Sequence, residues 1–205
     1  MKKLLVILIL IIIAATLILV VNNFTYVGDP YTLLYEGEYR QFRANLIEAN
    51  KTPVYPSESA VREVLLSPDV YKIQIAFIPN NTENAFYLAD TFEVVNKIGL
   101  VYRHLYKSQV STFQDTDNSS CLLFFDDGQT RCFKSTPINS TDELVPTPVE
   151  PVILFLGPSQ TDRTMISVSN SLITLEGGNF SEVDRKYTDL DLAVDKMLLI
   201  LMTGS

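Results

Sequence analysis

Histidine is the side chain that most often serves as a general base near neutral pH, and this chain of 205 residues contains a single one, His104. It lies near the end of a predicted helix, where a cationic side chain also suits the helix dipole. Serine and cysteine hydrolases would both have to use this residue, yet no GxSxG, HExxH, P-loop or GxGxxG motif accompanies it. We therefore interpret His104 as a surface or capping residue and assign no catalytic residue.

Carboxylate chemistry is harder to exclude, because the two acids of a glycoside hydrolase leave no local spacing signature. The obvious adjacent pair lies in Asp-Asp-Gly at 126–128, but that sequence is also typical of a tight hairpin turn. Asp115, Asp117 and Ser119 have the spacing of calcium ligands, but the sixth position of such a loop would be Ser120 instead of glycine. These patterns predict no metal and no cofactor.

The two cysteines, Cys121 and Cys132, flank the segment LLFFDDGQTR. An apolar run broken by Asp-Asp-Gly predicts a hairpin, which would bring the two thiols nearly opposite each other. We expect a disulfide there, worth roughly 2–4 kcal/mol. Two free buried thiols are the alternative, and a metal site is disfavoured because no CxxC motif is present.

Gly157-Pro158 follows a predicted buried strand and could form a ligand-facing loop at the end of a sheet. No GxG pattern supports a ligand-facing loop. The loop is nevertheless the basis of one functional alternative, a ligand-binding module with an apolar pocket near Gly157.

Asn-x-Ser/Thr sequences occur six times, where chance would give roughly two. Pro53 directly follows the site that starts at Asn50, which makes that site a poor acceptor for glycans. The remaining five are glycosylation candidates: Asn23, Asn80, Asn118, Asn139 and Asn179.

Residues 4–21 read LLVILILIIIAATLILVV and would span ~27 Å as a helix, close to the hydrocarbon thickness of a bilayer. Lys2 and Lys3 precede this run and no basic residue follows before Arg40, which predicts a cytoplasmic N-terminus. A cleaved signal peptide is the alternative, but the apolar run is long and no small-x-small site follows it. The expectation is an uncleaved single-pass anchor in residues 1–23, with residues 24–205 outside the cytoplasm.

The net charge of −8, from 24 acidic and 16 basic side chains, excludes whole classes of partner. A nucleic-acid binder needs a basic surface, and the chain has no cluster of Lys or Arg beyond residue 3. The same deficit argues against docking on anionic lipid headgroups.

The pattern of apolar residues predicts an α+β or mixed α/β domain behind the anchor. Helix 85–107 is expected to bury Leu88, Phe92, Val95, Ile98, Tyr102 and Leu105, which recur at spacings of three and four. A division into two subdomains near the proline-rich residues 135–151 is left open. The other expected elements are hairpins at 31–42, 109–134 and 165–178, strands at 70–78 and 152–157, and helices at 58–66 and 191–202.

Two stretches carry a resemblance to known proteins: residues 46–98, which begin LIEANKTPVYPSE, and VILFLGP (152–158) followed by LDLAVDKMLLILM (190–202). Together they resemble archaeal membrane-anchored surface proteins, and the second is similar to segments of archaeal S-layer proteins. The resemblance covers about half of the chain and implies a cell-envelope location. Its motifs are apolar packing residues, so it implies no catalytic residues.

Three functions are compatible with these patterns. The favoured hypothesis is a non-enzymatic envelope protein, anchored by residues 4–21, that interacts with other envelope proteins or an S-layer. An exported hydrolase that uses a carboxylate pair and a ligand-binding module of a transport or sensing assembly are the alternatives. The enzyme hypothesis predicts that two or more acids converge, at least one with a raised pKa.

Overall fold

A computed structural model describes residues 29–106, 110–114, 119–124, 130–179 and 187–204. Within these ranges no helix is both long and apolar enough to cross a bilayer. The expected anchor at 4–21 and the sequons at Asn23 and Asn118 lie outside the described residues, as do the acids at 115, 117, 126 and 127. The chain divides into two compact units, one ending at Phe42 and the other beginning at Arg43.

The described part of the first unit is a β-hairpin, in which β1 (Thr32–Tyr35) pairs antiparallel with β2 (Glu38–Gln41). Glu36 and Gly37 form its turn with positive φ angles, a conformation that glycine adopts without steric cost. The hairpin confirms the expectation for residues 31–42.

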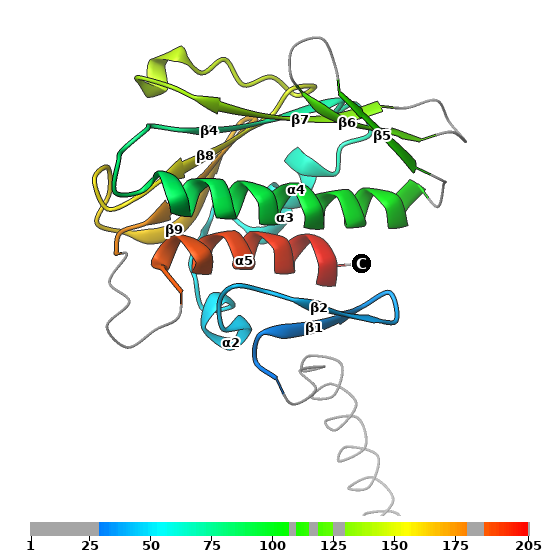
Figure 1. The fold of residues 1–205 in the computed structure, drawn as a ribbon, viewed down its shortest axis with the longest axis horizontal. Coiled ribbons are helices and arrows are strands. Elements are labelled where there is room, and N and C mark those ends of the chain that lie inside the picture. The colour runs from blue at the N-terminus through cyan, green and yellow to red at the C-terminus, as the bar shows by residue number, and fades with distance from the viewer. Residues whose placement is uncertain (1–28, 107–109, 115–118, 125–129, 180–186, 205) are drawn as a thin grey trace, which may run out of the picture. The chain divides into compact units, whose positions relative to one another are not determined.

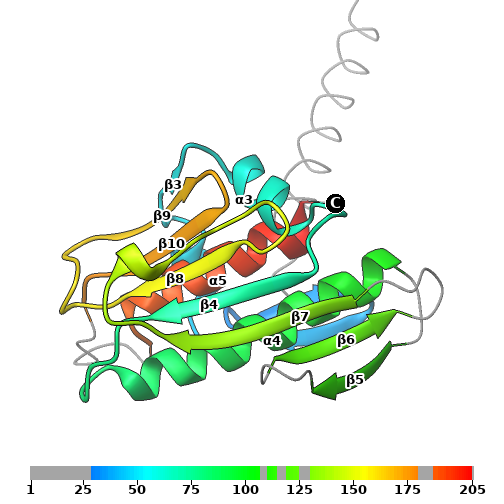
Figure 2. The same cartoon turned by 90° about the horizontal axis from the view of Figure 1, so that it is seen from above.

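The second unit, hereafter the main domain, contains an eight-stranded mixed sheet (Figures 1 and 2). Its centre is parallel: β7, β4, β8 and β10 run in one direction, and antiparallel strands flank them. In order across the sheet, the strands are β3 (Val54–Tyr55), β9 (Thr164–Ser169), β10 (Leu172–Gly177), β8 (Val152–Leu156), β4 (Lys72–Phe77), β7 (Thr130–Pro137), β6 (Ser120–Phe124) and β5 (Val110–Gln114).

Two long helices, α4 (Asn84–Tyr106) and α5 (Asp189–Thr203), lie side by side on one face of this sheet (Figure 1). The ring of Tyr87 on α4 packs against Phe77 and Phe155, which fixes that face of β4 and β8 toward the helix. Two shorter helices, α2 (Leu46–Ala49) and α3 (Glu58–Leu65), pack against α5.

The opposite face of the sheet is covered by the chain between β7 and β8, which includes the 3-10 helix η1 (Thr141–Glu143). On this side Ala76 and Leu154 are buried together with Ile138. They precede Phe77 and Phe155, whose side chains face the helices. Both β7 and β8 pair with members of the same sheet, and the two compact units of the chain meet at 42/43.

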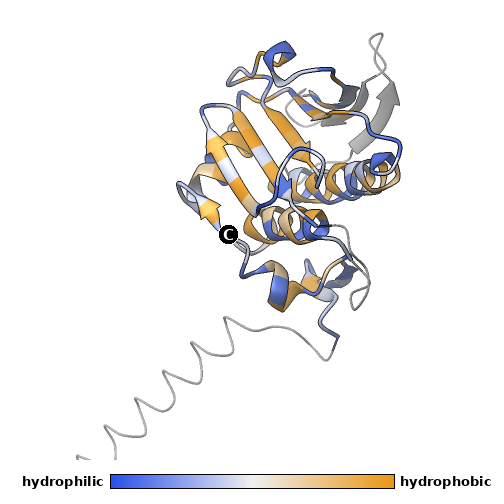
Figure 3. Cartoon of the chain, turned by 90° about the vertical axis from the view of Figure 1, so that its left-hand side faces the viewer, coloured by the Kyte–Doolittle hydropathy of each residue, from blue (hydrophilic) through white to orange (hydrophobic). Residues whose placement is uncertain are grey.

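Local sequence signals explain several elements. Ser57 caps α3, and Thr188 with Asp191 forms a capping box at the start of α5. In the hairpin of β9 and β10, Ile173 pairs with Val168 and Leu175 with Ile166, the register that the alternation predicts. The α+β class is thus confirmed; Figure 3 shows the strands largely hydrophobic and the helices mixed.

The predicted buried face of α4 was wrong in part. Leu88, Phe92 and Leu105 are exposed, whereas Ile98 and Tyr102 are buried as expected. The side that packs inward carries ionisable residues among its apolar ones: Tyr87, Asp90, Glu93, Val94, Lys97, Ile98, Val101 and Tyr102. Three of these inward positions would count as polar in any hydrophobic pattern, which is why the periodicity selected the wrong stripe.

Candidate functional site

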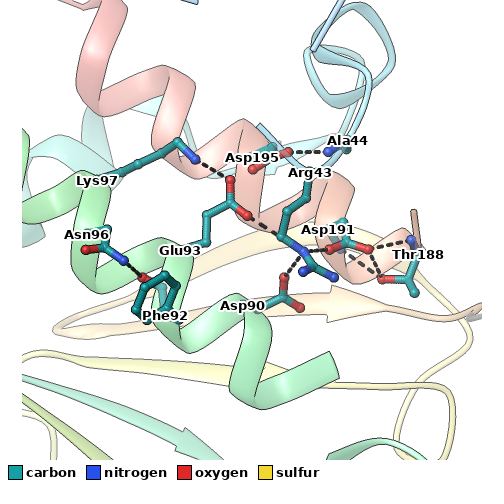
Figure 4. Close-up of polar contacts among 10 residues, drawn as sticks. All are labelled: Arg43, Ala44, Asp90, Phe92, Glu93, Asn96, Lys97, Thr188, Asp191 and Asp195. Atoms are coloured by element: carbon teal, nitrogen blue, oxygen red, sulfur yellow. Dashed lines mark hydrogen bonds and ion pairs between the residues drawn. The ribbon is translucent and has the colours of Figure 1, made fainter. Parts of the chain in front are cut away.

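Arg43 inserts its side chain between α4 and α5, where carboxylates from both helices surround it (Figure 4). Its Nε donates a hydrogen bond to Asp191 Oδ1. The same nitrogen lies 3.4 Å from Asp90 Oδ1 and 3.7 Å from Glu93 Oε2. The Nε of one guanidinium therefore lies near three acids and donates its hydrogen bond to the closest of them, Asp191.

Helical spacing brings these acids together. Asp90, Glu93 and Lys97 are three and four residues apart on α4, so they share one face. Asp191 and Asp195 are four apart on α5 and face the same space. We call these five residues and Arg43 the charge cluster.

Four members of the charge cluster have further polar contacts, whereas neither carboxyl oxygen of Asp90 has a hydrogen-bond partner among the described residues. Lys97 Nζ forms an ion pair with Glu93 Oε1. The backbone N–H of Ala44 donates to Asp195 Oδ2 at 2.6 Å, and Asp191 Oδ2 accepts from the backbone N–H and the hydroxyl of Thr188. The cluster thus joins the start of the main domain to both long helices.

Four carboxyl groups in the cluster face two cations, Arg43 and Lys97. Burial raises the pKa of Asp90 well above its usual range, and the nearby Asp191 raises it further. Burial likewise raises the pKa of Asp195, with the negative charge of Glu93 as the next cause. In both groups burial therefore favours the protonated form.

The burial of the acids decides what the cluster can do chemically. Asp90, Asp191 and Asp195 are at most 1% exposed, and Glu93 is also buried. Arg43 is the only cluster member whose side chain is more than a third exposed, at 37%. Among the described residues, no group of three or more His, Cys, Asp or Glu side chains could hold a metal ion. A substrate could therefore touch Arg43 but not the acids.

Sequence reasoning missed the charge cluster. The signal was present as charged residues at helical spacing within otherwise apolar helices, most plainly Asp191 and Asp195 in DLAVDKMLLILM. Such residues are almost never fully buried unless they are paired. Their partners lie about a hundred residues away on α4, however, and no local pattern identifies them.

The expected disulfide is present: Cys121 and Cys132 stand opposite each other on β6 and β7 and are bonded. Of the glycosylation candidates, Asn139 and Asn179 are exposed and Asn80 is half-buried. These sites lie in separate loops and form no common site. His104 is half-buried in the last turn of α4, away from the charge cluster.

The loop at Gly157 is filled by the protein itself. A Cβ there would lie 2.6 Å from Tyr87 Oη and 2.7 Å from Glu83 Oε2. Tyr87 donates to Glu83, which also accepts the backbone N–H and hydroxyl of Ser159. Glycine is needed here for close packing of the loop on α4, and this counts against a ligand pocket at Gly157.

Comparison of the chain with protein-family models, with curated proteins and with solved structures gives no significant match. The functional argument therefore rests on the residues and their geometry.

Proposed function

We propose that this chain is a single-pass membrane protein whose main domain lies outside the cytoplasm and acts as an interaction module of the cell envelope. The disulfide between Cys121 and Cys132 carries the proposal, because disulfides persist in oxidising compartments and are rare in the cytosol. The apolar run at 4–21, with Lys2 and Lys3 before it, supports the same orientation. Partners are expected among other envelope proteins, including S-layer proteins.

A non-enzymatic role is supported by the burial of the acids. The carboxyl groups that converge are enclosed between α4 and α5, where Asp191 pairs with Arg43 and Glu93 with Lys97. Such an arrangement holds helices together without access for a substrate. Binding through exposed surface is then the function that remains.

The experiment is a topology assay on the full chain with a C-terminal epitope, expressed in bacterial cells. We expect the protein in the membrane fraction after alkaline extraction, with the epitope digested by protease added to spheroplasts. Peptide mapping without reductant should recover Cys121 and Cys132 in one linked pair of peptides. A variant that lacks residues 4–21 is the control and should be soluble, protected and reduced. A full chain that behaves like this control would overturn the proposal.

An exported hydrolase remains the second candidate, because four carboxyl groups do converge and two of them have raised pKa values. It would require that α4 and α5 separate to admit a substrate. A glycosidase activity that Asp90→Asn abolishes, while the melting temperature stays unchanged, would establish this function instead. We expect no such activity.

A further inference from the structure

The outward side of α4 is apolar. Leu88 is 60% exposed and Phe92 is 73% exposed, and their spacing of four places them on adjacent turns of one side. Ala85 and Asn96 continue the same exposed stripe at either end. Large apolar side chains that adjoin each other on a surface are typical of contact sites.

This stripe also lacks charge. Between residues 84 and 96 the acids of α4 are Asp90 and Glu93, and both point inward to Arg43. The helix thus turns its carboxylates toward the core and its apolar side chains outward, the reverse of an ordinary surface helix. The chain as a whole has a net charge of −8, but this face carries no acidic group. Contact with an apolar or zwitterionic surface would therefore not remove water from a carboxylate.

Only a short stretch of chain separates the apolar run at 4–21 from the first residue of the main domain. Arg43, the first residue of the main domain, contacts Asp90 and Glu93 on α4, the immediate sequence neighbours of the stripe. About ten residues separate Val21 from Tyr31 and span at most ~34 Å. The hairpin adds little, because Phe42 N donates to Tyr31 O and closes it. A domain of about 160 residues is ~40 Å across, so the tether is no longer than the domain is wide.

We propose that the stripe of Leu88 and Phe92 docks on the surface of the bilayer in which residues 4–21 of the same chain are anchored. The inference rests on the proposed single-pass topology. Aromatic and aliphatic side chains partition into the boundary between headgroups and acyl chains. Two side chains alone would bind weakly, but the anchor keeps the domain at a high effective concentration beside the bilayer. Anionic lipids are not required, which agrees with the absence of a basic patch.

The chain has no tryptophan, so one introduced tryptophan reports its own surroundings. The test uses the full chain with Phe92→Trp in phosphatidylcholine vesicles, with and without brominated acyl chains. Val145→Trp is the matched control: Val145 is 79% exposed and follows Leu144, which packs against the sheet face opposite the helices. Ile12→Trp, in the middle of the apolar run, reports on the anchor itself.

With Phe92→Trp, we expect a blue-shifted emission that brominated lipid quenches by roughly half, because indole settles at the membrane interface. With Val145→Trp, the emission should stay that of an exposed indole and remain unquenched. Equal behaviour of the two variants overturns the docking. So does shielding of Phe92→Trp that depends on protein density and not on bromine, since a second copy would then cover the stripe.

The anchor variant separates failure of the docking from failure of the topology. Quenching of Ile12→Trp without quenching of Phe92→Trp removes the docking and leaves the anchor. If brominated lipid fails to quench Ile12→Trp, the proposed topology fails, and the docking fails with it.

Discussion

At the scale of single residues, the two aspartates beside Arg43 differ in their contact with it and should differ in the cost of replacement. Asp191 accepts a direct hydrogen bond from Arg43, so Asp191→Asn leaves that cation without its closest anion. We expect a loss of about 2–3 kcal/mol in the free energy of unfolding, less than for a fully buried pair because Arg43 is partly solvated. Urea unfolding of the chain without residues 1–23 measures this.

Asp90→Asn is the matched control for that variant. Asparagine is close in shape to a protonated aspartate, and burial raises the pKa of Asp90, which favours that protonated form. At neutral pH its free energy of unfolding should fall by no more than about 1 kcal/mol relative to the parent protein. Equal losses for the two variants would mean that Asp90 is ionised and that burial does not raise its pKa enough to keep its proton.

Glycan occupancy is expected to differ among the sequons. At Asn80, the N–H and hydroxyl of the exposed Thr82 both donate to Oδ1, and within the described part of the chain the side-chain nitrogen makes no hydrogen bond. At Asn50, Oδ1 accepts from the buried Lys196, and Thr52 is buried. After expression through a secretory pathway, mass spectrometry should find Asn80 modified and Asn50 bare. Occupancy at Asn50 equal to that at Asn80 would contradict this expectation.

At the scale of elements, the packing of α5 on the end of β10 depends on Gly177. A Cβ at this position would lie 2.3 Å from the backbone nitrogen of Leu190 and 2.5 Å from its Cα. Backbone in the first turn of a capped helix cannot shift cheaply, so Gly177→Ala should cost about 3 kcal/mol of unfolding free energy. Thermal unfolding followed by circular dichroism is the measurement.

Gly99→Ala provides the comparison within α4. The nearest atom to an added Cβ there is Leu122 Cδ1 at 3.4 Å, the movable end of a side chain. The helix gains about 1 kcal/mol from the better propensity of alanine, which offsets the tight contact. A destabilisation as large as that of Gly177→Ala would show that α4 approaches β6 as rigidly as α5 approaches β10.

Elements defined by local signals could be predicted from the sequence, and those defined by distant partners could not. The cap at Ser57, the turn near Asn170 and the pairing of Cys121 with Cys132 depend on neighbouring residues. The order of the parallel strands joins β4, β7 and β8 through long crossovers, which no short pattern specifies.

The inward face of α4 shows the same limit. A hydrophobic pattern scores Asp90, Glu93 and Lys97 as solvent-exposed, because it has no knowledge of Arg43 or of the acids on α5. Burial of those groups becomes favourable only once the partners are in place. The hydrophobic periodicity of α4 therefore does not reveal the candidate site. It predicts instead that Leu88 and Phe92 are buried, whereas both are exposed.

At the scale of the whole molecule, the charge cluster couples stability to pH because it joins the start of the main domain, α4 and α5. A carboxyl whose pKa is raised on folding binds its proton more tightly in the folded state than in the unfolded state. Its contribution is fully present below the unfolded pKa of 3.8 and is lost as pH rises toward the raised value. Each such group lowers the free energy of unfolding by up to about 1.4 kcal/mol per pH unit in that window.

Asp90→Asn removes one such group without removing its shape. From about pH 4 to pH 7, the parent protein should therefore lose stability relative to the variant. Carboxylates in salt bridges also change stability with pH, but they change it equally in both proteins. Urea unfolding of both proteins across this range yields the difference directly. Parallel curves would mean that Asp90 titrates near its ordinary pKa, and α4 and α5 would then be held together by an ionised cluster whose charge Arg43 and Lys97 alone do not balance.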